Sequence, residues 1–209
     1  MGIRVKFLLC IFLICSMGSA IAVERERSKE ERKIMNRSIN DIVNSFEKEM
    51  KDQFGLMCTG LGGGMHYEIE KIGIDFLLHQ QTSVEEAREL EIRATERFVD
   101  LINTNESIKP YLMDYPWDQN RADVMIAFRD EYGEDYPEGV TLILQAKNQL
   151  IYYGPEKFPN DIDHLKEEPY AEAKAFVENN PSCLKPVEKA QKKKNGLVGF
   201  KNRKDGRTL

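Results

Sequence analysis

The sequence has few of the residues that carry most enzyme chemistry. It contains three histidines, one tryptophan and four cysteines among 209 residues. No Gly-x-Ser-x-Gly motif is present, which argues against a serine nucleophile elbow. The glycine-rich residues 60–64 follow a predicted helix and no Lys-Ser/Thr pair comes after them, so no phosphate-binding loop is predicted either. The histidines lack the spacing of a metal-ligand set. We predict no metal and no cofactor, and the question of catalytic activity stays open at this point.

Long apolar runs are also absent, with one exception at the N-terminus. A short basic segment precedes the apolar residues 7–15, and Ala20 and Ala22 match the small-x-small pattern of a cleavage site. The run is about half of the roughly 20 residues that cross a bilayer. Residues 1–22 are therefore predicted to be a secretory signal peptide. The mature chain is expected in the periplasm, the cell envelope or the secreted space, without a transmembrane segment, and a lipidated or uncleaved N-terminus is the alternative.

Cleavage at this site would leave only two cysteines, Cys58 and Cys183. An even pair in an oxidising compartment is typical of one disulfide, and we predict that these two residues form it. Two free thiols are the alternative.

Positive charge is concentrated at the C-terminus. Residues 185–209 contain nine Lys or Arg against two acidic residues, whereas the whole chain has a net charge of −5. We predict a disordered basic tail after an acidic body, and a contact between the tail and an anionic surface is the alternative. Nucleic-acid binding is not predicted, because the tail has one aromatic residue, Phe200, where stacking would need several.

The apolar periodicity predicts an α+β fold. Residues 23–54 form an amphipathic helix, and residues 55–184 form one domain. Within that domain Ser83 and Glu86 make a capping box at the start of a helix. The remaining expected elements are a strand over 65–79, that helix over 84–103, strands near 124–128, 140–146 and 150–153, and a helix over 169–177. Only residues 147–149 separate the last two strands, which predicts a tight hairpin. This order favours a mainly antiparallel sheet of about four strands packed by helices.

One loop, residues 104–120, collects aromatic side chains. Tyr111, Tyr115 and Trp117 lie there beside Asp118, and such mixtures are typical of protein and glycan contacts. We predict that this loop or the face of the sheet binds a protein or glycan partner. The alternative for Trp117 is that it fills the edge of the core.

The favoured function is therefore a non-catalytic binding or accessory protein of the exported space. The rival hypothesis is a small exported hydrolase that acts on glycans. It would use Asp114, Asp118 or the cluster of Asp161, Asp163 and His164 as acid, base or ligands.

Overall fold

The computed structural model describes residues 27–65, 67–155 and 163–184. The predicted signal peptide (1–22), the predicted basic tail (185–209) and Asp161 lie outside these residues, so the predictions about them stay predictions. Among the described helices, none combines the length and the apolar character that a membrane crossing requires.

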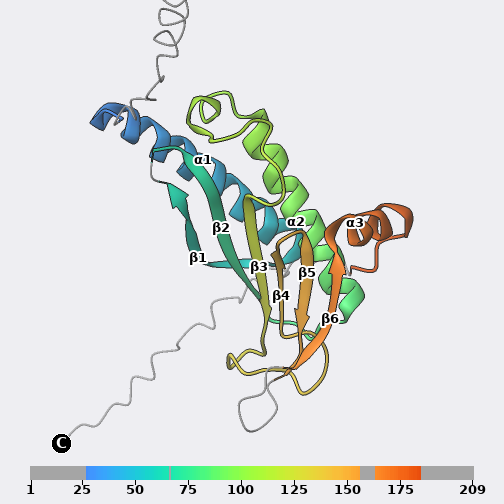
Figure 1. Ribbon diagram of the computed structural model, residues 1–209. Coiled ribbons are helices and arrows are strands. Elements are labelled where there is room, and N and C mark those ends of the chain that lie inside the picture. The colour runs from blue at the N-terminus through green and yellow to red at the C-terminus, as the bar shows by residue number, and fades with distance from the viewer. Residues whose placement is uncertain (1–26, 66, 156–162, 185–209) are drawn as a thin grey trace, which may run out of the picture.

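In the described residues, three α-helices and six strands form an α+β fold, which confirms the predicted class (Figure 1). The elements are α1 (Lys29–Phe54), β1 (Met57–Met65), β2 (Ile69–Leu78), α2 (Val84–Thr104), the 3-10 turn η1 (Lys109–Tyr111), β3 (Ala122–Phe128), β4 (Leu142–Ala146), β5 (Gln149–Tyr153), β6 (His164–Pro169) and α3 (Tyr170–Asn179).

The strands form one sheet in the order β1-β2-β3-β4-β5-β6. Strands β2 and β3 are parallel because α2 connects them as a crossover, and the other neighbouring pairs are antiparallel. The predicted, mainly antiparallel sheet of about four strands was therefore wrong in strand number, and the sheet of six strands is mixed because β2 and β3 run parallel. Strand β1 was missed because it contains four glycines, and β6 because its sequence, HLKEEP, has no apolar alternation.

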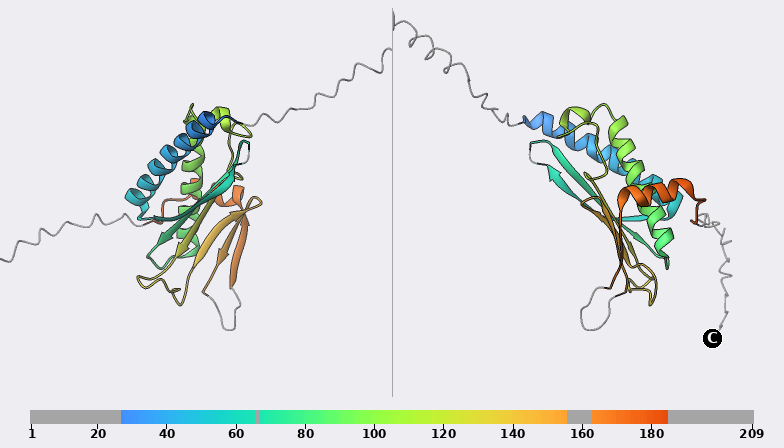
Figure 2. Two further views of the ribbon diagram at one scale, coloured as in Figure 1. Left: turned by 90° about the vertical axis from the view of Figure 1, so that its left-hand side faces the viewer. Right: turned by 45° about the vertical axis from the view of Figure 1, so that its right-hand side comes forward.

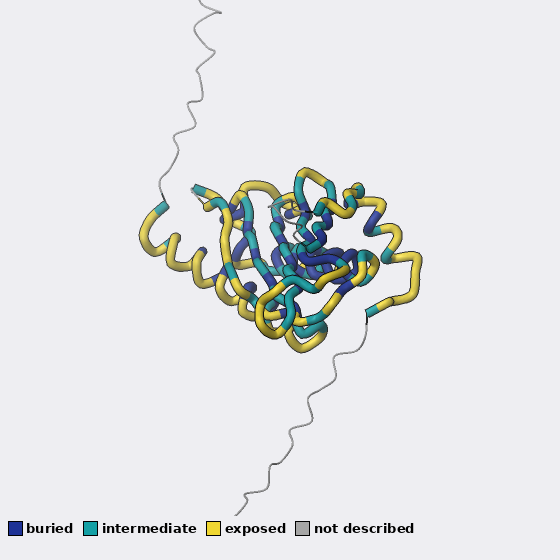
Figure 3. The backbone as a smooth tube through the Cα atoms, turned by 90° about the horizontal axis from the view of Figure 1, so that it is seen from below, coloured by how far each residue is buried: buried dark blue, intermediate teal, exposed yellow. Residues whose placement is uncertain are grey.

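The three described helices pack on one face of the sheet, and none of them covers the other face (Figure 2). The core lies between these two layers. Phe46 of α1 stacks on Phe98 of α2 with ring centroids 4.8 Å apart, and it meets Phe76 of β2 edge-on at 5.6 Å. Viewed from below, the buried positions gather in the middle of the molecule, and much of α1's outer side is exposed (Figure 3).

Local sequence signals fix the ends of several elements. The capping box of Ser83 and Glu86 begins α2 as predicted, and Gly55 ends α1 in the left-handed conformation with φ 75°. The predicted hairpin between β4 and β5 turns through Lys147 and Asn148, which both have positive φ. Two such residues give the turn whose twist matches antiparallel strands.

Candidate binding surface

Two of the four residues predicted to bind a partner through the aromatic loop are buried in the structure. Trp117 is 2% exposed and Tyr111 is 8% exposed, whereas Tyr115 is 55% exposed and Asp118 is also exposed. The side-chain amide of Asn103 in α2 binds both backbone groups of Trp117, at 2.8 Å and 2.9 Å.

In the structure Tyr111 and Trp117 are therefore not part of an exposed contact surface. Their large apolar rings gain more from burial than from contact with solvent. The structure shows the alternative, in which Trp117 fills the core. Binding through Tyr115 and Asp118 stays a prediction.

The carboxylates of the rival hydrolase site have separate structural partners. Asp114 forms an ion pair with Arg121, and Asp118 accepts a hydrogen bond from the backbone N–H of Asn120 at 2.9 Å. Asp123 lies on β3 and pairs with Lys71 at 2.7 Å. Among the residues that the structure describes, no group of His, Cys, Asp and Glu side chains could hold a metal ion. Asp161, one member of the predicted cluster, lies outside those residues.

The predicted disulfide is not formed in the structure, because Cys58 and Cys183 are free cysteines on different parts of the fold. Cys58 lies at the start of β1 and interacts with Glu47 of α1, whereas Cys183 follows α3 and hydrogen-bonds Glu89 of α2 at 3.0 Å. Burial and the neighbouring glutamate raise the pKa of each thiol to about 11. A nucleophilic cysteine needs the thiolate, so this environment disfavours such a role.

One ionisable side chain is completely enclosed. Glu91 of α2 is 0% exposed, its Oε1 accepts a long hydrogen bond of 3.4 Å from Thr95, and its Oε2 has no partner among the described residues. Burial raises the pKa of this carboxyl well above its ordinary value, and nearby Asp123 raises it further. This environment favours the neutral form of the carboxyl and places it there at a cost in stability.

We expect the substitution Glu91→Gln to raise the free energy of unfolding at pH 7 by about 1–3 kcal/mol, because glutamine needs no proton to be neutral. Because the pKa of Glu91 is raised in the folded state, its contribution to stability is fully present below the unfolded-state pKa near 4.5. That contribution is lost as the pH rises through the folded-state pKa. Urea unfolding at several pH values measures the difference, which should grow from acid to neutral pH. The exposed Glu85→Gln is the control, and an equal response of both variants would refute the argument.

The face of the sheet that carries no helix has an unexpected composition. Its side chains are only partly exposed, and the strand register places them in rows. One row crosses four strands with Leu77, Ala127, Leu142 and Tyr153, and the next contains Asp75, Met125, Leu144 and Ile151. We call this surface, made of these two rows together with Gly62, Gly73 and Asp123, the open face.

A hollow of about 300 Å³ lies at one end of the open face. It is lined by Leu61, Gly62, Gly63, Gly73, Asp75, Asp123, Met125 and Leu144. Its floor is formed where Gly62 of β1 pairs with Gly73 of β2. Two acidic and several apolar side chains surround this floor, so the hollow suits a group that is both cationic and partly aliphatic.

This surface could be found in the sequence only in part. In the segments VMIAF, LILQA and LIYY, apolar residues occur at both sets of alternating positions, so they point to both faces of the sheet. This pattern is typical of strands covered on both faces. The glycine hairpin that makes the hollow has no such signal. The chain matches no protein-family model, no curated protein and no solved structure at a significant level.

Proposed function

We propose that this chain is an exported, non-catalytic binding protein that holds a segment of a partner protein on its open face. The bound segment is apolar and carries a lysine or arginine that enters the hollow beside Asp75. Export rests on the N-terminal sequence, and the binding role rests on the open face. The observation that carries the proposal is the glycine-floored hollow at the end of two mainly apolar rows.

The apolar rows support a protein partner. An antiparallel sheet with one solvated face normally presents polar side chains there. Here seven of the eight side chains in the two rows are apolar, and no described element covers them. Contiguous apolar surface of this kind marks interaction sites, and a glycan would favour aromatic platforms, of which these rows offer only Tyr153.

The two glycines of the floor support a bound group in the hollow. Glycine weakens a strand interior and often marks a place where a ligand approaches the backbone closely. A Cβ added at Gly62 would meet no atom within 4 Å, and one added at Gly73 would make only ordinary contacts, the nearest at 3.5 Å. Neither position has the positive φ that would require glycine. Packing within the chain therefore does not explain them.

The charge of the hollow selects the kind of group. Asp123 is paired with Lys71 at 2.7 Å, but the carboxylate of Asp75 has no ion-pair partner among the described residues. A lysine or arginine has the positive charge that Asp75 would bind and an aliphatic stem that would contact Met125 and Leu144. Electrostatic complementarity thus favours a basic side chain here.

We expect Gly73→Val to weaken binding while it preserves the fold, because valine suits a strand and its side chain fills the hollow. The probe is a displayed library of short random peptides, selected on the full chain. Enriched peptides should carry Lys or Arg flanked by apolar residues. Their affinity should fall about tenfold or more in Gly73→Val, which corresponds to about 1.4 kcal/mol.

Two further variants separate charge from shape in this test. Asp75→Asn removes the carboxylate without changing the volume, and it should weaken peptides that contain Lys or Arg more than their glutamine versions. Glu172→Gln removes an exposed carboxylate from α3 on the helix side and should change nothing. Peptides that bind wild type and Gly73→Val equally well would show that the hollow is not the site.

A further inference from the structure

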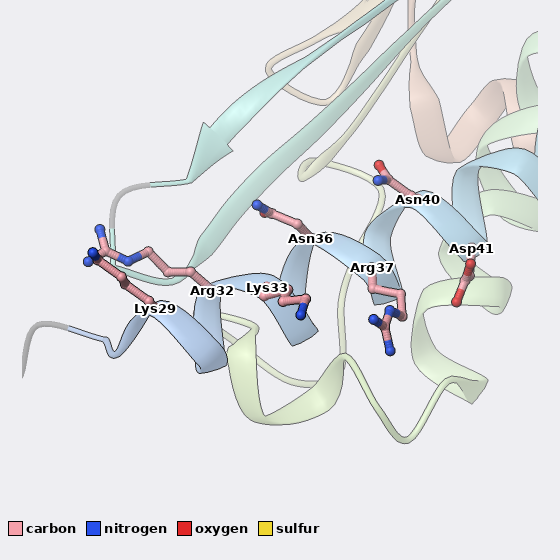
Figure 4. A pocket seen from close by; sticks show the side chains of 7 residues that line it. All are labelled: Lys29, Arg32, Lys33, Asn36, Arg37, Asn40 and Asp41. Atoms are coloured by element: carbon pink, nitrogen blue, oxygen red, sulfur yellow. The ribbon is translucent and has the colours of Figure 1, made fainter.

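A second concave surface lies on the helix side of the molecule, along one flank of α1. A hollow of about 580 Å³ is lined by Lys29, Arg32, Lys33, Asn36, Arg37, Asn40 and Asp41, whose side chains extend from the first half of the helix (Figure 4). Another hollow, of about 430 Å³, is lined by Asn44, Glu47, Lys48 and Lys51 of the same helix and by Leu56, Met57 and Cys58. The second hollow therefore lies between α1 and the start of β1.

The charge of this flank is opposite to that of the whole chain. Six cationic side chains line the two hollows, and we call them the basic flank: Lys29, Arg32, Lys33, Arg37, Lys48 and Lys51. Only Asp41 and Glu47 are acidic there, although the chain has a net charge of −5. Within the described part of the chain, Lys29, Lys33 and Arg37 form no ion pair. These three side chains thus present positive charge that no ion pair within the described residues neutralises.

Strand β1, which borders this flank, is an edge strand. In the described sheet it pairs with β2 alone, so its outer N–H and C=O groups have no strand partner. Edge strands are commonly protected by charged residues or proline. The β1 sequence, MCTGLGGGM, contains neither, and Met57, Leu61 and Met65 are exposed. The pairing of β1 with β2 is irregular between Cys58 and Gly60 and between Gly64 and Met65, so the regular stretch 60–64 is the part of this edge suited to pair with an added strand.

We infer that an extended acidic segment of a partner polypeptide binds between the basic flank and β1. Its backbone adds to the edge of β1, and its carboxylates lie along the basic flank. The two hollows are concave and one of them borders unpaired backbone groups, which favours a polypeptide over the flat surface of a bilayer. The inference uses the outer edge of β1 and the basic flank, not Asp75 or the two apolar rows of the open face, although β1 also contributes Leu61, Gly62 and Gly63 to the hollow. Its success or failure is therefore separate from that of the proposed function.

The test uses a fluorescent synthetic peptide of alternating glutamate and valine, titrated into the full chain at low salt. We expect saturable binding by anisotropy that weakens as salt is added. Lys33→Gln combined with Arg37→Gln should weaken it about tenfold, because two partly solvated charge pairs are lost. Backbone amides of β1 should exchange more slowly with solvent when the peptide is bound.

The controls distinguish binding between the basic flank and β1 from binding to other basic segments of the chain. Lys192→Gln with Lys193→Gln removes two charges from the basic C-terminal segment and should leave the affinity unchanged. A peptide of alternating lysine and valine, which suits the open face, should bind wild type and the Lys33→Gln, Arg37→Gln double variant equally well. Equal loss in both double variants, or unchanged exchange in β1, would overturn the inference. Binding of anionic phosphatidylglycerol vesicles in place of the peptide, sensitive to Lys33 and Arg37, would assign the flank to a membrane surface and overturn it as well.

Discussion

Replacing Trp117 by alanine is expected to destabilise the fold by about 3–5 kcal/mol, as large-to-small substitutions of buried aromatic residues do. The side chain is 2% exposed and is among the largest fully buried ones. Its removal leaves a cavity. It also loosens the loop around residue 117, whose backbone N–H and C=O are both hydrogen-bonded to the side-chain amide of Asn103 in α2. Urea unfolding followed by circular dichroism would measure the loss.

Tyr115 provides the matched control, because it lies two residues away in the same loop and is 55% exposed. Tyr115→Ala should change the stability by less than about 1 kcal/mol, as surface substitutions usually do. Trp117→Phe should recover part of the loss, since it refills most of the volume and removes an indole N–H that has no hydrogen-bond partner among the described residues. If Trp117→Ala were no more harmful than Tyr115→Ala, Trp117 would not belong to the core.

Trp117 also shows what the sequence can and cannot predict about a site. A tryptophan beside charged residues in a loop fits either a contact surface or a core anchor, because side-chain chemistry is the same in both. The choice depends on whether a neighbouring element supplies apolar cover. That information is not local, since the Asn103 partner lies 14 positions away in α2. Burial decided the question against an exposed Trp117.

Elements with strong periodic signals were predicted well. The helix after Ser83 was expected over 84–103 and spans Val84–Thr104, and the hairpin turn at Lys147 was expected as well. Both depend on short-range chemistry, a capping box in one case and a two-residue turn in the other.

The strands that were missed depend on their partners. Gly62 and Gly63 have no strand propensity of their own, and β1 exists because it pairs along nearly its whole length with β2. The charged strand β6 is likewise held by pairing with β5 and by the ion pair of Glu168 with Arg88. The sequence alone does not predict the candidate hollow for the same reason, because its floor exists only when Gly62 and Gly73 are paired.

Breaking the ion pair between Arg88 and Glu168 should cost about 3–5 kcal/mol, because one partner would remain buried without its counter-charge. The side chains are 5% and 13% exposed, and two hydrogen bonds of 2.6 Å and 3.3 Å join them. Tyr152 and Lys166 also donate to Glu168, at 2.5 Å and 2.8 Å. The group connects α2 to strands β5 and β6, so Glu168→Gln should loosen that end of the sheet.

The pH dependence gives this prediction a second readout. Burial raises the pKa of Glu168, but hydrogen bonds from Arg88, Lys166 and Tyr152 outweigh it and lower the pKa below the ordinary value of 4.5. A lowered pKa means that the pair stabilises the fold above pH 4.5 and that this contribution is lost as the pH falls through the folded-state pKa. The difference between wild type and Glu168→Gln should therefore be largest at neutral pH and shrink in acid.

A double variant separates the interaction energy of the ion pair from the cost of burying each of its two charges. Arg88→Met with Glu168→Leu removes both charges, and it should cost less than the sum of the single losses because neither charge is left unpaired. Glu106→Gln is the control, since it breaks an ion pair with Lys109 in which the glutamate side chain is 81% exposed, and it should have little effect. Equal losses for Glu106→Gln and Glu168→Gln would mean that solvent screens the Arg88 pair, and the anchoring of β6 would then rest on its backbone pairing with β5 alone.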